Sequence, residues 1–93
     1  MSGPSITGDL DPFTWNQREA VDYEVALELI AEAMAVYTAL ANQAEGTEAE
    51  RLRSERARCV QDRLALRDAD HATVKRVTTE YSDLIRRLRE ARR

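Results

Sequence analysis

The stretch Ala44-Glu45-Gly46-Thr47-Glu48-Ala49-Glu50 decides the fold of this chain, because it holds the only Gly or Pro after residue 12. Gly46 can adopt the left-handed conformation that ends a helix. Thr47 and Glu50 have the S/T-x-x-E spacing of a capping box, which starts the next helix. Since the connection at residues 45–47 is so short, we expect the second helix to fold back antiparallel beside the first.

The residues before the turn are predicted to form one helix from about 16 to 45. A heptad seam, with apolar steps of 4, 3, 4, 3 and 4, is formed by Ala26, Ile30, Ala33, Tyr37, Leu40 and Ala44. Flanking apolar rows are formed by Val25, Leu29, Val36 and Ala39 and by Leu27, Met34 and Ala41. This apolar arc is too wide for one neighbouring helix.

We expect this wide apolar arc to form a core that is shared between copies of the chain. The predicted oligomer core consists of Ile30, Ala33, Met34, Tyr37 and Leu40. A chain of 93 residues buries a smaller share of its surface than a larger domain does, which also favours help from a partner.

The residues after the turn are predicted to form a second helix from about 48 to 91. At 1.5 Å per residue it is roughly 65 Å long, against about 42 Å for the first helix. Its seam turns polar at Arg67 and His71. An alternative remains open there, in which the chain breaks at Asp68-Ala69-Asp70 and Asp70 caps a third helix.

The unequal lengths of the two helices predict an overhang at residues 78–93. The overhang and an extended N-terminal arm, residues 1–14, meet the first helix at the same end. The predicted partner-binding residues are Phe13, Trp15, Tyr81, Leu84, Ile85 and Leu88. The predicted fold is therefore all-α: an antiparallel two-helix hairpin, residues 15–93, with a longer second helix, dimerising into a four-helix bundle.

Nucleophilic catalysis finds little support in the residue types present. Cys59 and His71 are the only Cys and His, and twelve residues of helix set them roughly 18 Å apart. A lone cysteine also excludes an intrachain disulfide. The three glycines are isolated, so no phosphate-binding loop is present. We expect no enzymatic activity and no cofactor.

A metal site of the helical-bundle type is a lesser alternative. Such sites place a carboxylate and a histidine three residues apart on one helix face, a spacing that Asp68 and His71 share. A hairpin turned at Gly46 brings Glu24 and Glu28 near this step. We interpret these residues instead as a polar layer that sets the helix register, and we expect no bound metal.

Charge is divided along the sequence. Residues 17–45 carry six acidic residues against Arg18, whereas residues 46–93 carry thirteen basic residues against nine acidic ones. The residues for possible nucleic-acid contact are Arg86, Arg87, Arg89, Arg92 and Arg93. Cations at a helix C-terminus also complement the helix dipole, so nucleic acid is only the alternative partner.

The sequence shows neither a signal peptide nor an apolar stretch that could span a bilayer, because Glu28 and Glu32 interrupt the longest one. We expect a cytoplasmic protein that does not bind membranes. The function that fits best is a non-enzymatic module for protein–protein interaction and oligomerisation, with an adaptor, assembly or antitoxin-like role. It would form a homodimer and bind another protein.

Overall fold

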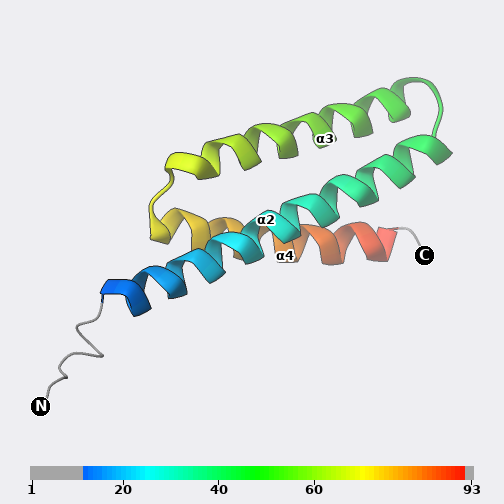
Figure 1. The fold of residues 1–93 in the computed structure, drawn as a ribbon. Helices are drawn as coiled ribbons and strands as arrows, with labels where there is room; N and C mark the ends of the chain where they lie inside the picture. The colour runs from blue at the N-terminus through cyan, green and yellow to red at the C-terminus, as the bar shows by residue number, and fades with distance from the viewer. Residues whose placement is uncertain (1–11, 92–93) are drawn as a thin grey trace, which may run out of the picture.

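The computed structural model describes the backbone of residues 12–91 and the side chains of residues 17–91. Its elements are α2 (Pro12–Gln43), α3 (Gly46–Ala65), the 3₁₀ turn η1 (Leu66–Asp68) and α4 (His71–Ala91) (Figure 1). No strand occurs within residues 12–91. The prediction of an all-helical chain is confirmed, with three α-helices in place of two.

Helix α2 begins at Pro12, earlier than the predicted start near residue 16. Proline suits the first turn of a helix, because its fixed φ is helical and its missing N–H would have no partner there. The predicted arm, residues 1–14, is therefore shortened at its inner end. Residues 1–11 lie outside the described part of the chain.

The turn between α2 and α3, at residues 44–45, lies within two residues of the predicted turn at 45–47. Gly46 has a φ of +64°, the left-handed conformation expected of it. The predicted capping box is wrong, because α3 begins at Gly46 with Glu45 as its N-cap and without a side-chain cap. Thr47 then lies inside the first turn of the helix, where it does not occupy the cap position.

The predicted continuous helix from residue 48 to 91 is wrong, and the alternative with a break is correct. Ala69 has an extended backbone, with φ −78° and ψ 147°. The Asp70 carboxylate accepts a hydrogen bond from the backbone N–H of Thr73 at 2.8 Å and so caps α4. Folding back buries the apolar row of α4, which a straight helix would leave in water.

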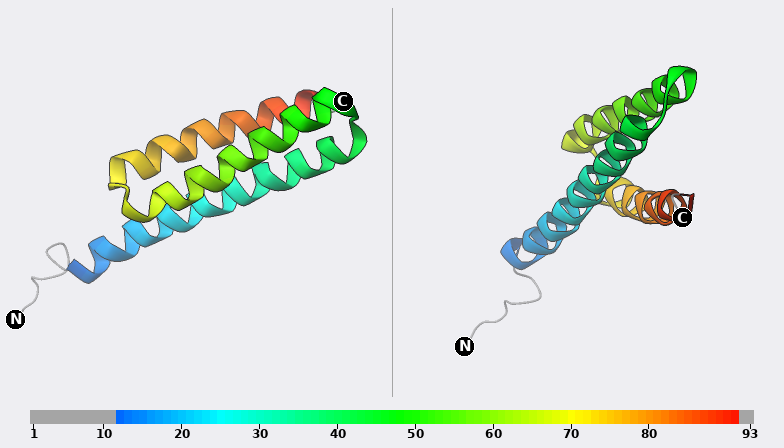
Figure 2. Two further views of the ribbon diagram at one scale, coloured as in Figure 1. Left: turned by 90° about the horizontal axis from the view of Figure 1, so that it is seen from above. Right: turned by 90° about the vertical axis from the view of Figure 1, so that its right-hand side faces the viewer.

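Helix α2 is the centre of the molecule. Helix α3 packs antiparallel along it, and α4 packs along a different side of it in the same direction as α2 (Figures 1 and 2). Contacts between α3 and α4 themselves are sparse. The two helices lie close at η1 and diverge toward the α2–α3 turn (Figures 1 and 2).

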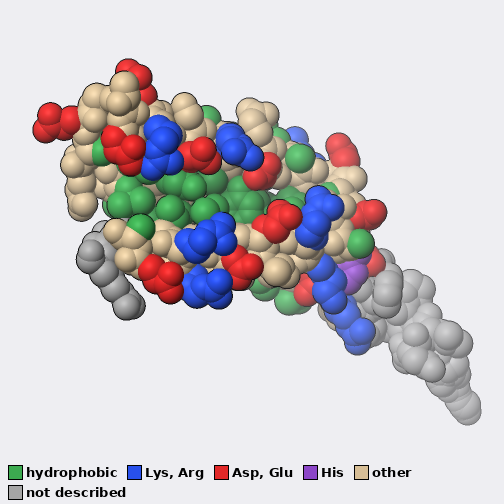
Figure 3. Space-filling view, turned by 180° about the vertical axis from the view of Figure 1, so that it is seen from behind, with side chains coloured by type: hydrophobic (Ala, Val, Ile, Leu, Met, Phe, Trp, Pro, Cys, Tyr) green, Lys and Arg blue, Asp and Glu red, His purple; other side chains and the backbone are tan. Residues whose placement is uncertain are grey.

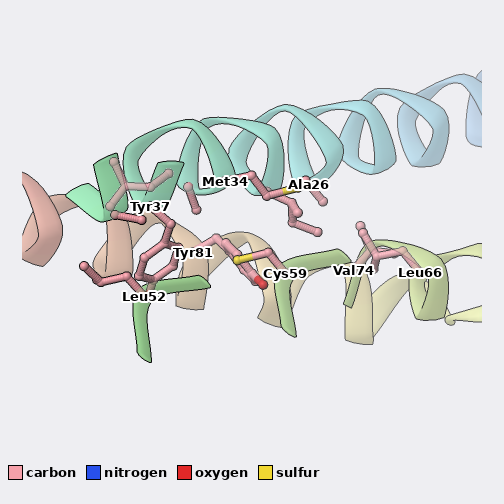
Figure 4. Close-up of a cluster of buried hydrophobic side chains, with 12 residues drawn as sticks. Ala26, Met34, Tyr37, Leu52, Cys59, Leu66, Val74 and Tyr81 are labelled. Atoms are coloured by element: carbon pink, nitrogen blue, oxygen red, sulfur yellow. The ribbon is translucent and has the colours of Figure 1, made fainter. Parts of the chain in front are cut away.

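The hydrophobic core lies along α2, between it and the two other helices (Figure 4). Its buried members are Ala26, Ile30, Ala33, Met34, Tyr37, Ala41, Leu52, Cys59, Leu66, Val74, Tyr81 and Ile85. Four of the five predicted oligomer-core residues are thus buried within a single chain, and Leu40 is half-buried. Two helices of the same chain cover the arc that one could not.

The predicted overhang at residues 78–93 is wrong as well. It followed from the continuous helix, and the break at Ala69 removes it. Tyr81 and Ile85 are each 6% exposed and pack in the core, while Leu84 and Leu88 are half-buried. Within residues 12–91, no helix is long and apolar enough to cross a membrane.

Replacing Ile30, the largest fully buried side chain, tests this core directly. We expect Ile30→Ala to lower the free energy of unfolding by about 3 kcal/mol, from lost burial and the cavity left behind. Val21→Ala, at a side chain that is 56% exposed on the same helix, should change it by less than about 0.5 kcal/mol. Urea denaturation measures both; equal losses would contradict the packing described.

Candidate protein-binding groove

The divergence of α3 and α4 leaves a groove between them, with α2 as its floor. Figure 3 shows this face of the molecule: apolar side chains run along the groove between two rows of charged ones. The groove consists of two adjoining hollows of about 280 and 310 Å³, which share Tyr37. Apolar residues that line this α3–α4 groove are Tyr37, Leu40, Leu52, Cys59, Tyr81, Leu84 and Leu88.

The rim of the α3–α4 groove carries charges of both signs. Its charged residues are Glu48, Arg51, Glu55, Arg58 and Asp62 on α3 and Glu80 and Arg87 on α4. Neighbouring charges on α3 pair along the helix, as in Arg51 with Glu48 at 2.8 Å. Exposed pairs of this kind contribute little stability. The rim therefore favours neither a strongly acidic nor a strongly basic ligand.

A hydrogen bond across the groove joins its two walls near the η1 end. The Tyr81 hydroxyl of α4 donates to the Asp62 carboxylate of α3 at 2.6 Å. Burial raises the pKa of Tyr81 strongly, and the adjacent Asp62 carboxylate raises it further. The hydroxyl therefore stays protonated at neutral pH and remains a donor that fixes the spacing of α3 and α4 here.

Cys59 lies in the α3 wall and is only 2% exposed. Burial raises the pKa of its thiol, so the reactive thiolate is scarce at neutral pH. Burial likewise raises the pKa of the Tyr37 hydroxyl in the floor. These groups are packed, protonated side chains, and the groove offers no activated nucleophile among them.

The candidate metal ligands are not brought together. Among the described residues, no group of three or more His, Cys, Asp and Glu side chains could hold a metal ion. His71 instead lies against Asp22, with its Nε2 2.6 Å from the Asp22 Oδ2. This pair ties the start of α4 to α2. Asp22 was not identified from the sequence, because only Glu24 and Glu28 were considered as carboxylates of the first helix near Asp68 and His71.

The predicted arginine cluster is divided by the fold. Arg89 pairs with Glu32 of α2, and Arg86 lies 3.4 Å from Asp83 on its own helix. Arg87 lines the α3–α4 groove. Arg92 and Arg93 lie outside the described residues. A carboxylate thus faces two of the three described arginines, which weakens the argument for a phosphate-binding surface.

The predicted partner-binding residues are separated into three places. Leu84 and Leu88 line the groove, whereas Ile85 lies in the core. Tyr81 belongs to both, because its ring is buried and its hydroxyl reaches the groove wall. Phe13 and Trp15 lie in the first turns of α2, but their side chains are outside the described part. The α3 wall, with Leu52 and Cys59, was missed, since it becomes a wall only once α4 folds back.

Comparison with family models, with curated proteins and with solved structures returned no match for this chain. Any function of this chain is therefore inferred from the groove itself.

Tyr81→Phe tests the bond that joins the groove walls. At pH 7 we expect the free energy of unfolding to fall by about 1 kcal/mol, because the hydroxyl–carboxylate hydrogen bond is lost. The ordinary pKa values are 9.0 for cysteine and 10.0 for tyrosine, and folding raises those of Cys59, Tyr37 and Tyr81. Stability is thus complete below about pH 9 and declines as the pH rises, since the unfolded chain loses these protons first.

The variant lacks the ionisable hydroxyl at position 81, so its alkaline decline should be smaller than that of the wild type. Urea denaturation at pH 7 and pH 10.5 should show the difference between the two proteins shrinking by roughly 1 kcal/mol. A difference that stays constant with pH would show that Tyr81 titrates alike in the folded and unfolded states.

Proposed function

We propose that this chain is a non-catalytic helical module that binds an amphipathic helix of a partner protein in the α3–α4 groove. This mode of binding is compatible with an adaptor, assembly or antitoxin-like role. The observation that carries the proposal is the apolar lining of the groove, in which Leu40, Leu84 and Leu88 are only half-buried (Figure 3). Apolar surface of this kind, rimmed by polar residues, is typical of interaction sites.

The dimensions of the groove favour a helix as the ligand. Its α3 wall extends from Glu48 to Asp62, which is roughly 21 Å of helix or about four turns. A helix of similar length can place apolar side chains at i, i+3, i+4 and i+7 along the floor. The mixed charges of the rim then meet the polar flanks of the bound helix, on which both signs are tolerated.

We also propose that two copies of the chain associate into a dimer. Apolar side chains remain exposed outside the groove: Val21 at 56%, Val25 at 39% and Leu64 at 48%. The chain is also small, and small domains often gain stability by oligomerisation. Light scattering over a range of concentrations tests this association; a constant monomer mass would contradict it.

Leu84→Arg tests the groove as the partner-binding site. The arginine stem can lie along the apolar wall, so the fold is retained while the charged end obstructs the groove. We expect capture of the partner from the native cell to fall at least about tenfold, the size of effect typical of a central interface residue. Ser82→Arg is the matched control, because Ser82 is an exposed residue of α4 that does not line the groove.

Quantitative mass spectrometry of the captured proteins gives the comparison, and circular dichroism confirms that each variant is helical. The proposal is supported if one captured protein is lost with Leu84→Arg and retained with Ser82→Arg. Identical capture by wild type and both variants would show that the groove is not the binding surface.

A further inference from the structure

We infer that η1 is a hinge through which α4 leaves its own α2 and docks on the α2 of a second copy, giving a domain-swapped dimer. This inference deepens the proposed self-association and rests on it. A second copy of the chain is the binding partner of the released α4, because its α2 presents the same surface that α4 covers within one chain. The exchange is mutual, so the dimer closes on itself and leaves no unpaired α4.

The connection between α3 and α4 is nearly helical already. Ala65 and Leu66 keep right-handed helical angles, with φ −66° and −65°, and residues Leu66–Asp68 form a 3₁₀ turn. Ala69 departs from helical geometry, through a ψ of 147°. No Gly or Pro lies between Gly46 and the end of the chain. A 3₁₀ segment inside an otherwise helical sequence often marks a hinge.

Helix α4 makes few interactions with α3 and many with α2. Contacts between α3 and α4 are sparse, and the Tyr81–Asp62 hydrogen bond is the main polar link between them. On α2, α4 is held by the His71–Asp22 and Arg89–Glu32 pairs. The same helix buries Val74, Tyr81 and Ile85 in the core. Separation from α3 therefore removes few interactions.

Every contact that α4 makes with α2 can form again with the α2 of a second copy. The Tyr81–Asp62 hydrogen bond can also form again, between the two chains. The exchange thus conserves the buried core and the ion pairs, and its free energy depends mainly on the hinge and on association. Straightening gives up the Asp70 cap and gains the helical hydrogen bonds across residues 66–73.

A chain with a straightened hinge cannot bury the apolar row of its own α4. The straightened helix, Gly46–Ala91, is roughly 69 Å long and carries the apolar row of α4 away from its own α2. That row needs a surface with matching apolar residues and with carboxylates at the positions of Asp22 and Glu32. A second copy supplies all of these, so the dimer contains two α2 helices and two long helices.

Two substitutions in the hinge should move the dimer in opposite directions. Asp70→Ala removes the cap that favours the bent form and improves helix propensity, so it should favour the dimer. Ala69→Gly is tolerated by the extended backbone of the bent form but disfavours the straight helix, so it should favour the monomer. Ala57→Gly is the matched control, because this exposed residue lies in the interior of α3 and is helical in both forms.

Sedimentation equilibrium over a range of concentrations measures the shift. Each dimer straightens two hinges, so a change of roughly fivefold per hinge becomes about 25-fold in the dimer dissociation constant. We expect Asp70→Ala to tighten the dimer by about this factor and Ala69→Gly to weaken it by several-fold or more. Ala57→Gly should leave the dissociation constant close to that of the wild type.

Hydrogen exchange distinguishes a swapped dimer from one formed by docking of bent chains. In the bent form, the amide of Ala72 lies in the first turn of α4, where helical acceptors are absent; in the straight helix it is bonded. Its protection in the dimer, together with opposite shifts for the two hinge variants, supports the exchange.

A dimer that responds to neither hinge substitution and leaves the Ala72 amide unprotected would overturn the exchange while leaving the proposed self-association intact. A monomer at every concentration, for wild type and Asp70→Ala alike, would overturn both.

Discussion

The burial of two different sides of α2 is the interaction on which the rest of the structure depends. The seam through Ala26, Ile30 and Ala33 is wholly buried, and apolar residues continue around the helix on both flanks. One helix covers only one flank, because a packed neighbour shields a limited arc. The chain therefore bends after Leu66, and α4 takes the flank that α3 leaves exposed. The cost of breaking a helical segment that lacks Gly and Pro is offset by this burial.

The groove follows from the same constraint. Since α3 and α4 each follow their own flank of α2, they meet only near η1 and separate toward the α2–α3 turn (Figures 1 and 2). The gap leaves the edge of the core partly exposed at Leu40 and Leu84, where a further helix would cover it. In this fold α3 and α4 each pack mainly on α2 and make few contacts with each other. Both the proposed binding of a partner helix and the proposed exchange of α4 are inferred from this arrangement.

The parts of the structure that depend on neighbouring residues could be predicted from the sequence. The left-handed Gly46, the seam of α2 and the capping role of Asp70 are properties of short segments. The local sequence does not determine whether the helix breaks, because Asp68-Ala69-Asp70 is compatible with a break and with a continuous helix. The burial of α4 on α2 determines which of the two forms. The groove could not be predicted for the same reason: Leu52 and Leu84 form opposite walls only after that choice is made. The apolar pattern identified Leu84 and Leu88 as binding residues. It did not identify the surface that these residues share with α3.

The central claim, that α3 and α4 separate along α2, is tested most directly by two distances measured with paired spin labels. In a Cys59→Ala background, one pair joins Glu50 and Glu90 near the α2–α3 turn and the other joins Gln61 and Arg76 near η1. All four residues are exposed, and their spacing along each helix points the labels in similar directions. We predict a clearly longer distance for Glu50 with Glu90. Equal distances would show that α3 and α4 pack along their whole length, which would leave no groove.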